Sequence, residues 1–239
     1  MRKFGTEYAG FYYPASLHTL TSDSILYCVG VGEDISHDVE LARALDARVY
    51  LFDPTPRAIA HASLVRSVMD DPSKAVHSPS FGGGDVRYWE TILKNRIDPD
   101  RIVLTPCGVY SKNAMMRFYK PTNPSYVSCS VVPGMKSSVS EYDVPVKTLR
   151  TLMTELHHDR IDLLKLDVEG AECDVIDSML SDAIYPHFLA VDFDLGWHGE
   201  HIRDMDRCAS TIRKLGTHGY RLIRSDGSNY SFEREKIKK

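Results

Sequence analysis

Two glycines and several carboxylates lie where the first strongly apolar stretch of the sequence ends. Residues 24–31 are almost continuously apolar, and Gly30 and Gly32 stand at the end of this stretch. The next apolar run, residues 48–52, ends in Asp53, which is 21 residues beyond Gly32. Glycines allow the backbone to turn tightly and to approach a ligand closely. A carboxylate at this distance can accept hydrogen bonds from both ribose hydroxyls, so the spacing predicts a nucleoside site.

The charges beside these glycines distinguish two kinds of nucleoside cofactor. A dinucleotide requires its pyrophosphate at the N-terminus of the following helix, with a third glycine for close packing. Here the third glycine is absent, and Glu33 and Asp34 occupy the phosphate position, where they would repel a diphosphate. S-adenosylmethionine carries an ammonium and a sulfonium group, which these acids would attract. The alternative is that both acids merely complement the helix dipole.

This charge pattern favours S-adenosylmethionine over NAD as the cofactor. We expect Gly30, Gly32 and Glu33 to hold its methionine end and Asp53 to hold its ribose. Cys107 and Gly108, which follow the third predicted strand, are candidates for contacts with the adenine edge.

A second set of acids follows the clearest apolar run, residues 161–168. Asp167 ends this run, and a charge at the end of a buried strand is unfavourable unless it is paired or used. Lys165 lies on the same face two residues earlier, so the pair is either a structural charge clamp or a contact for the acceptor. Glu169 and Glu172 follow; they either line the acceptor site or complement the dipole of the next helix. We predict that Asp167 is catalytic and that Lys165 and Glu169 bind substrate.

The run at residues 187–195 ends near further groups that could remove a proton from a hydroxyl. Asp192 and Asp194 alternate onto one face, and His198 follows them. Because an alkyl hydroxyl has a pKa of roughly 15, like that of bulk water, methyl transfer to it is helped by a base. His198 is the candidate general base, and Asp194 a candidate substrate contact. Alternatively, Asp167, Asp192 and Asp194 could bind Mg²⁺, which would acidify the hydroxyl.

The elements that must position these groups alternate along the chain. Apolar runs at 48–52, 101–105, 161–168 and 187–195 are interleaved with segments of helical periodicity at 34–45, 56–68, 146–157, 171–180 and 201–215. Segments 220–223 and 230–232 form a closing hairpin. This order predicts an α/β, Rossmann-like fold: a doubly wound, mostly parallel sheet that ends in an antiparallel strand at its edge.

The remaining segments predict one domain with decorations. Residues 1–24 are rich in aromatic side chains and are expected to form an irregular arm packed on the domain, which spans 25–239. Residues 70–86 read as an inserted loop. Residues 120–142 are rich in Ser, Pro and Gly and are a candidate lid.

Composition limits the partners. The net charge of −4 and the absence of a long basic run argue against nucleic acid. Five cysteines without a CxxC pair indicate reduced thiols and a cytoplasmic location. An apolar signal core and a membrane-length apolar stretch are both missing, so we expect no membrane span; the oligomeric state stays open.

Residues 161–172 resemble the signature of the FkbM family of S-adenosylmethionine-dependent methyltransferases. Residues 30–36 are similar to the family's first glycine motif in its Glu-Asp-Ile-Ser variant, and 52–56 to its ribose-binding acidic motif. Residues 146–149 and 230–232 resemble the stretch leading into the signature and the closing strand. The resemblance implies a class I methyltransferase fold and O-methylation of hydroxyls on sugars, glycans or natural products. A catalytically silent nucleoside-binding module and an NAD-dependent oxidoreductase on the same sheet are the alternatives.

Overall fold

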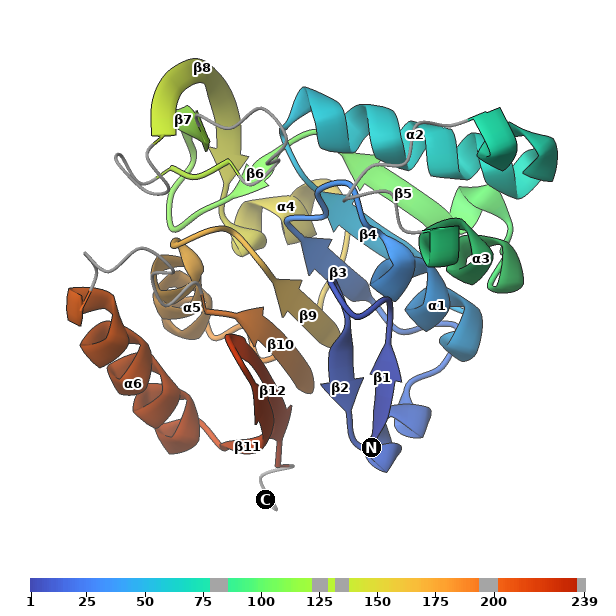
Figure 1. Ribbon diagram of the computed structural model, residues 1–239. Helices are drawn as coiled ribbons and strands as arrows, with labels where there is room; N and C mark the ends of the chain where they lie inside the picture. The colour runs from blue at the N-terminus through green and yellow to red at the C-terminus, as the bar shows by residue number, and fades with distance from the viewer. Residues whose placement is uncertain (78–85, 122–128, 132–137, 194–201, 236–239) are drawn as a thin grey trace.

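A seven-stranded sheet forms the centre of the molecule (Figure 1). The computed structural model describes residues 1–77, 86–121, 129–131, 138–193 and 202–235. The strand order is β11-β12-β10-β9-β3-β4-β5. The strands are β3 (Leu26–Val29), β4 (Val49–Phe52), β5 (Ile102–Thr105), β9 (Leu163–Leu166), β10 (Phe188–Asp192), β11 (Tyr220–Asp226) and β12 (Asn229–Arg234).

The predicted Rossmann-like, mostly parallel sheet is confirmed. Neighbouring strands from β5 to β10 pair in parallel, and the closing strand β12 is antiparallel to both β10 and β11. The prediction is wrong on one point, because β12 is not the edge strand. The crossover through α6 (Ile202–Thr217) places β11 at the edge, and the hairpin returns β12 into the gap beside β10.

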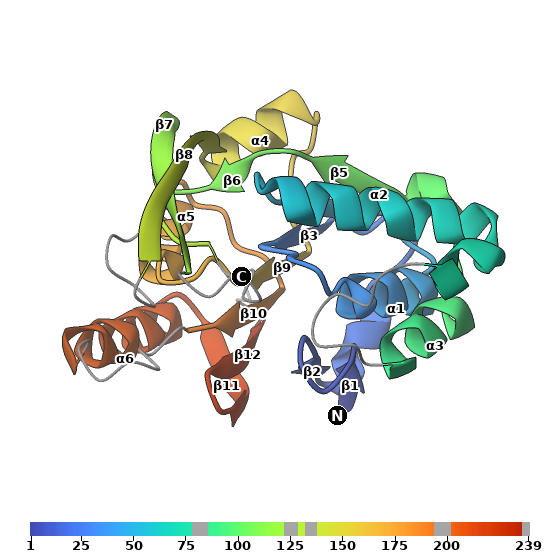
Figure 2. The same cartoon turned by 45° about the horizontal axis from the view of Figure 1, so that its top comes forward.

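Helices cover both faces of the sheet, which explains why its central strands are apolar on both faces, with Lys165 of β9 as an exception. α1 (Ser36–Leu45), α2 (Pro56–Asp70) and α3 (Val86–Lys94) pack on one face, and α4 (Leu149–Glu155), α5 (Glu172–Ser181) and α6 on the other (Figure 2). Along β3 the side chains alternate between the two layers: Tyr27 and Val29 contact the second set of helices, and Cys28 the first. Pro56 opens α2, as predicted, and the Thr55 side chain caps it.

The N-terminal segment is more regular than its composition predicts. β1 (Arg2–Phe4) and β2 (Phe11–Tyr13) form an antiparallel hairpin, and the short 3₁₀ helix η1 (Ala15–Thr19) follows. Phe4, Phe11 and Tyr13 are buried against residues of β3, β9, β10 and α1. This burial explains how strands of three residues each are held in place.

A small second sheet separates β5 from α4. It has the order β6-β8-β7 and consists of β6 (Gly108–Val109), β7 (Ala114–Pro121) and β8 (Ser138–Lys147). The predicted lid at 120–142 is therefore strand at both ends, and 122–128 and 132–137 lie outside the described residues. The helix predicted from 146 begins only at Leu149, because Val146 still pairs with β7, Lys147 pairs with β6, and Thr148 caps the helix.

The insertion predicted at 70–86 contains the end of α2, the short 3₁₀ helix η2 (Pro72–His77) and the first residue of α3; its residues 78–85 are not described. A further 3₁₀ turn, η3 (Pro99–Arg101), leads into β5. Within the described part of the chain, none of the helices combines the length and the apolar character needed to cross a membrane.

Candidate functional site

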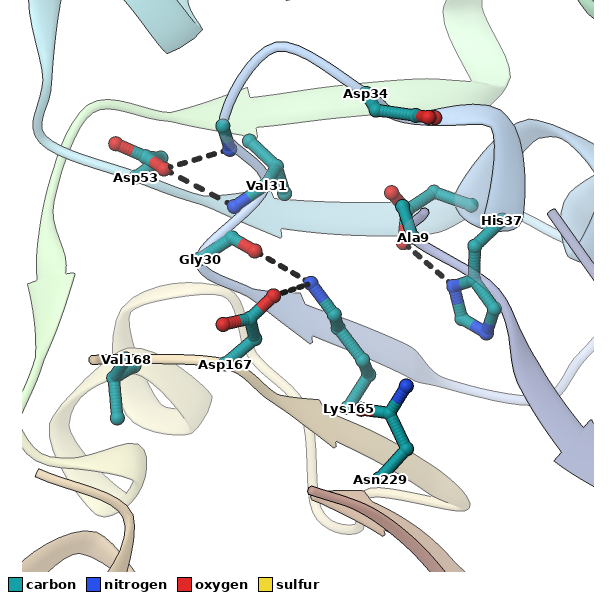
Figure 3. A network of polar contacts seen from close by, with 12 residues as sticks. Ala9, Gly30, Val31, Asp34, His37, Asp53, Lys165, Asp167, Val168 and Asn229 are labelled. Carbon is teal, nitrogen blue, oxygen red and sulfur yellow. Dashed lines mark hydrogen bonds and ion pairs between the residues drawn. The ribbon is translucent and has the colours of Figure 1, made fainter. Parts of the chain in front are cut away.

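The groups singled out in the sequence meet at the carboxyl ends of β3, β4 and β9. Figure 3 shows the turn after β3 lying between Asp53, which follows β4, and Asp167, which follows β9. Parallel pairing in register brings these ends together, since Val29 lies opposite Phe52 on one side and Leu166 on the other.

The two glycines of the turn have different functions. Gly30 has a φ of +71°, and a Cβ there would lie 1.6 Å from the Asp167 carbonyl oxygen. It therefore permits the close approach of β3 to β9. Gly32 also has a positive φ, but nothing lies within 4 Å of the position that its Cβ would take. Gly32 thus faces open space, as a residue beside a ligand should.

The Asp53 carboxylate holds this turn in place. One oxygen accepts hydrogen bonds from the Val31 and Gly32 N–H groups at 3.0 and 3.1 Å. The other accepts from the Thr55 N–H at 2.8 Å and the Thr55 hydroxyl at 2.7 Å. These four donors use the acceptor positions that a carboxylate offers. Asp53 is also buried, so its contacts within the protein are structural, a use that the sequence analysis missed.

The acids beside the glycines do not face the crevice as two free negative charges. The Arg57 guanidinium donates two hydrogen bonds of 2.7 Å to the buried Glu33 carboxylate. The Asp34 carboxylate accepts from the Thr6 hydroxyl at 2.6 Å and from the Ser36 N–H at the start of α1 at 2.9 Å. The alternative interpretation, in which the acid stabilises the start of the following helix, therefore describes Asp34 well. The charge of Glu33 is neutralised by Arg57.

Lys165 and Asp167 form the pair that their spacing suggested. The buried Lys165 ammonium lies 2.5 Å from the Gly30 carbonyl oxygen and 3.3 Å from an Asp167 carboxylate oxygen (Figure 3). Burial alone would lower the pKa of Lys165, but the charges of Asp167 and Asp38 outweigh it and raise that pKa above its usual value. The ammonium therefore stays charged. Because the Asp167 side chain is 34% exposed, it can contact a ligand while Lys165 cannot.

A buried polar network behind Lys165 was missed. Asp38 lies 3.1 Å from His37 Nδ1, and His37 Nε2 lies 3.0 Å from the Tyr13 hydroxyl. Burial works to raise the pKa of Asp38, but hydrogen bonding and charge from His37, together with the Lys165 charge, lower it. The network could have been found, because position 38 shares a helical face with the buried positions 35 and 42.

This network also contains a possible set of metal ligands. Cys28, His37 and Asp38 offer ligand atoms that lie within 4.8 Å of one another. Both His37 nitrogens already have protein partners, and the Lys165 ammonium acts on the same carboxylate, so the group fits an internal polar network better than a cation. Among the described residues, Asp167 and Asp192 do not belong to such a set of ligand atoms, so the Mg²⁺ alternative gains no support.

The turn that follows β9 is stabilised by hydrogen bonds to the carboxylate of Glu172. The buried Glu172 carboxylate accepts from the Val168 N–H at 3.0 Å and the Gly170 N–H at 3.1 Å, and burial raises its pKa. Glu169 adopts a left-handed backbone with φ of +56°. Its carbonyl accepts a hydrogen bond of 2.6 Å from the Ser130 hydroxyl. The segment between β7 and β8 therefore contacts the turn that carries Asp167.

Of the remaining predicted residues, Cys107, Gly108 and Asp192 are placed less favourably. Cys107 and Gly108 are buried; a Cβ on Gly108 would lie 3.0 Å from a Val146 methyl and 3.5 Å from the Pro54 ring. Asp192 ends β10, opposite Asn229 of β12. Asp194 and His198 lie outside the described residues.

These contacts allow a test of the expected cofactor. An open glycine, a turn fixed by a buried acid and a partly exposed carboxylate meet at one sheet edge. These groups suit a nucleoside with a cationic end and offer its sulfonium the Asp167 carboxylate rather than Glu33. The residues present therefore fit S-adenosylmethionine.

Comparison with known proteins agrees with this chemistry. The family model described as the methyltransferase FkbM domain matches residues 32–222, about four-fifths of the chain. A search of curated proteins found no match.

Several solved structures are similar in fold. A fibrillarin pre-rRNA processing protein from Methanococcus jannaschii has 9% identity and a TM-score of 0.42, over 90% of this chain and 68% of its own. An rRNA methylase from Streptococcus thermophilus has 11% identity and a TM-score of 0.45, over 92% of both chains. A precorrin-6y C5,15-methyltransferase from Geobacter metallireducens has 11% identity and a TM-score of 0.39, over 92% of this chain and 85% of its own. Likenesses at this level carry no information about the acceptor.

Proposed function

Because the chain belongs to the FkbM methyltransferase family and so uses S-adenosylmethionine, we propose that it methylates a hydroxyl oxygen of a sugar, a glycan or a natural product. When bound, the cofactor supplies an electrophilic methyl group on its sulfonium. Membership of this methyltransferase family argues against the alternative of an NAD-dependent oxidoreductase. The choice of oxygen as the methylated atom, and of the acceptor class, rests on the family resemblance and on the groups at the sheet edge.

The turn after β3 is the proposed seat of the cofactor. Gly32 leaves room for it, and Gly30 lets β3 and β9 approach closely enough to form one surface. Glu33, through its ion pair with Arg57, and Asp53, through its bonds to the turn, hold this surface in shape. The ribose is proposed to lie against the turn that Asp53 supports, and the adenine edge beside Cys107 and Gly108.

The observation that carries the proposal is the Asp167 carboxylate, which is partly exposed at the end of β9 and is oriented by a buried ammonium. We assign it the orientation of the acceptor hydroxyl and a share in taking up its proton. Lys165 is proposed to act through Asp167 and Gly30 as a positioning residue, as in the charge-clamp interpretation, rather than as a substrate contact. Glu169 and Asp194 are proposed to line the acceptor pocket, with His198 as general base.

In-line methyl transfer requires no covalent bond between the protein and either reactant. Catalysis then rests on holding the two reactants in line and on excluding water. The β6-β8-β7 sheet is the proposed cover, and its connection is already in contact with the reacting edge through the Ser130–Glu169 hydrogen bond.

The test is a transfer screen with methyl-labelled S-adenosylmethionine. Glycans, free sugars, hydroxylated small molecules and a structured RNA serve as acceptors, with and without EDTA, and Asp167→Asn serves as the inactive control. We expect label on a sugar or small-molecule hydroxyl, identified as a methoxy carbon by NMR, and insensitivity to EDTA. Label on nitrogen, carbon or RNA would contradict the proposal. Cofactor binding without transfer to any acceptor would instead favour the silent nucleoside-binding module.

A further inference from the structure

Two cysteines face each other between α5 and α6. Cys173 lies in the first turn of α5 and Cys208 in α6, and these helices run side by side on one face of the sheet (Figure 1). Their sulfur atoms are 3.8 Å apart, and both residues are buried. A disulfide requires about 2.05 Å between the sulfurs, so small side-chain rotations would have to close the remaining gap.

We propose that Cys173 and Cys208 are a dithiol pair that a peroxide oxidises to a reversible intramolecular disulfide. Neither residue contributes to the binding or catalytic groups described above, so the proposal does not depend on the acceptor of the methyl group.

The surroundings of Cys173 favour its thiolate. The Cys208 thiol hydrogen-bonds to it, and the Thr211 hydroxyl and the Arg207 guanidinium act in the same direction. Burial and the Asp177 carboxylate oppose them, but the net effect lowers the pKa of Cys173. Since the thiolate is the reactive form, Cys173 should attack first.

The reaction has two steps. The Cys173 thiolate attacks one oxygen of hydrogen peroxide, the O–O bond breaks, and the products are a sulfenic acid and hydroxide. The Cys208 thiol then attacks the sulfenic sulfur, the S–S bond forms and water leaves. The peroxide is reduced to two waters for the two electrons and two protons that the thiols give up.

Two other buried cysteines lack these features. Burial and the Asp38 charge raise the pKa of Cys28, and burial raises that of Cys107. Among the buried cysteines, the structure therefore predicts selective oxidation at the α5–α6 pair.

The position of the pair couples it to the turn after β9. Cys173 follows Glu172, whose carboxylate holds the Val168 and Gly170 N–H groups of that turn. A disulfide would fasten α6 to the start of α5, directly beside this support.

The test is oxidation of the reduced full-length protein by hydrogen peroxide, followed by alkylation and non-reducing peptide mapping. We expect one Cys173–Cys208 cross-link per chain, reversed by dithiothreitol, and a melting temperature about 5–10 °C higher in the oxidised form. Cys173→Ser and Cys208→Ser should abolish both effects, and Cys129→Ser should change neither. Dimedone should label Cys173 in the Cys208→Ser variant. The reaction rate should be half-maximal below the pH of roughly 8.5 at which an ordinary thiol titrates.

Two results would overturn the proposal. One is a wild-type protein in which Cys173 and Cys208 remain alkylatable thiols after the oxidant has consumed Cys129. The other is a cross-link that joins either residue to another cysteine or to a second chain.

Discussion

A carboxylate at the end of a buried strand requires a partner, and in this protein Lys165 is the partner of Asp167. The ammonium also binds the Gly30 carbonyl, so one buried charge fixes both the turn after β3 and the acid after β9. The exposed part of Asp167 is then a fixed negative group at the edge where the cofactor and the acceptor are proposed to meet.

Asp167→Asn should lower kcat by about 100-fold or more, which is typical when a positioned acid–base group is lost. The dissociation constant for S-adenosylhomocysteine should change by less than about threefold, since its sulfur carries no charge for Asp167 to attract and Asn preserves the shape of the turn. Steady-state kinetics and calorimetry measure the two effects, and Asp177→Asn on the exposed side of α5 is the matched control. A larger loss in affinity than in kcat would remove Asp167 from the chemical step.

Asp53→Ala should weaken S-adenosylhomocysteine binding at least tenfold, about 1.4 kcal/mol, because the turn loses the acceptor of its Val31 and Gly32 N–H groups. Calorimetry measures this loss. A 2′-deoxy analogue separates support of the turn from direct recognition of the ribose. If the contact is direct, the penalty for the analogue disappears in Asp53→Ala. Unchanged affinity for the parent ligand would show that the ribose assignment is wrong.

At the residue scale, the sequence was sufficient to bring Gly30, Gly32, Asp53 and Asp167 together, because ends of neighbouring parallel strands must meet. It was insufficient to show how the carboxylates are used. The Glu33–Arg57 ion pair forms because α2 leaves β4 in a direction that brings Arg57 to Glu33. The charges in the local sequence do not reveal this direction.

At the scale of elements, α1 and β9 are joined by opposite buried charges, Asp38 and Lys165. Lys165→Met should destabilise the protein by about 3–5 kcal/mol, because it removes the buried ammonium that balances the charges of both Asp167 and Asp38. Urea unfolding measures the loss. Adding Asp38→Asn should restore part of the stability, whereas additive losses in the double variant would show that the two residues do not interact.

α2 and α3 meet at His61, whose ring lies 2.5 Å from the Tyr88 hydroxyl. Burial lowers the pKa of His61 from 6.5 to about 4, so the unfolded chain binds the proton more readily than the folded one. The stabilisation is complete above pH 6.5 and is lost as the pH falls towards 4. Between pH 7 and pH 5 the loss should be about 2 kcal/mol by linkage.

His61→Gln, which can keep a hydrogen bond to Tyr88, should remove that part of the pH dependence in urea unfolding. His218→Gln, which changes a partly exposed histidine directly after α6, is the control. Identical pH profiles for His61→Gln and the wild-type protein would show that His61 titrates normally.

The elements of the central sheet were predictable, since long apolar runs alternate with amphipathic segments. The hairpin β1–β2 and the strand β8 were not. Strands of three residues carry no readable alternation, and they form here because Phe4, Phe11 and Tyr13 are buried against the sheet. The residues that lead into β8 have a loop-like composition, and pairing with β7 decides their conformation.

At the scale of the whole molecule, the two helical layers cover the faces of the sheet, and the edge at the carboxyl ends of its strands is where we propose that the reactants bind (Figure 2). The small β6-β8-β7 sheet stands between β5 and α4 in the chain and contacts this edge at Glu169. A cytoplasmic location and the absence of a nucleic-acid acceptor stay predictions, drawn from the cysteine content and from the net charge of −4.

The central claim is that the turn after β3 and the acid after β9 form one cofactor surface. A crystal structure of the complex with S-adenosylhomocysteine tests it most directly. The nucleoside should lie against Gly32 and Asp53, with the sulfur directed towards the Asp167 side of the crevice. Binding of S-adenosylhomocysteine at another place, with this crevice empty or filled by a diphosphate, would contradict the account.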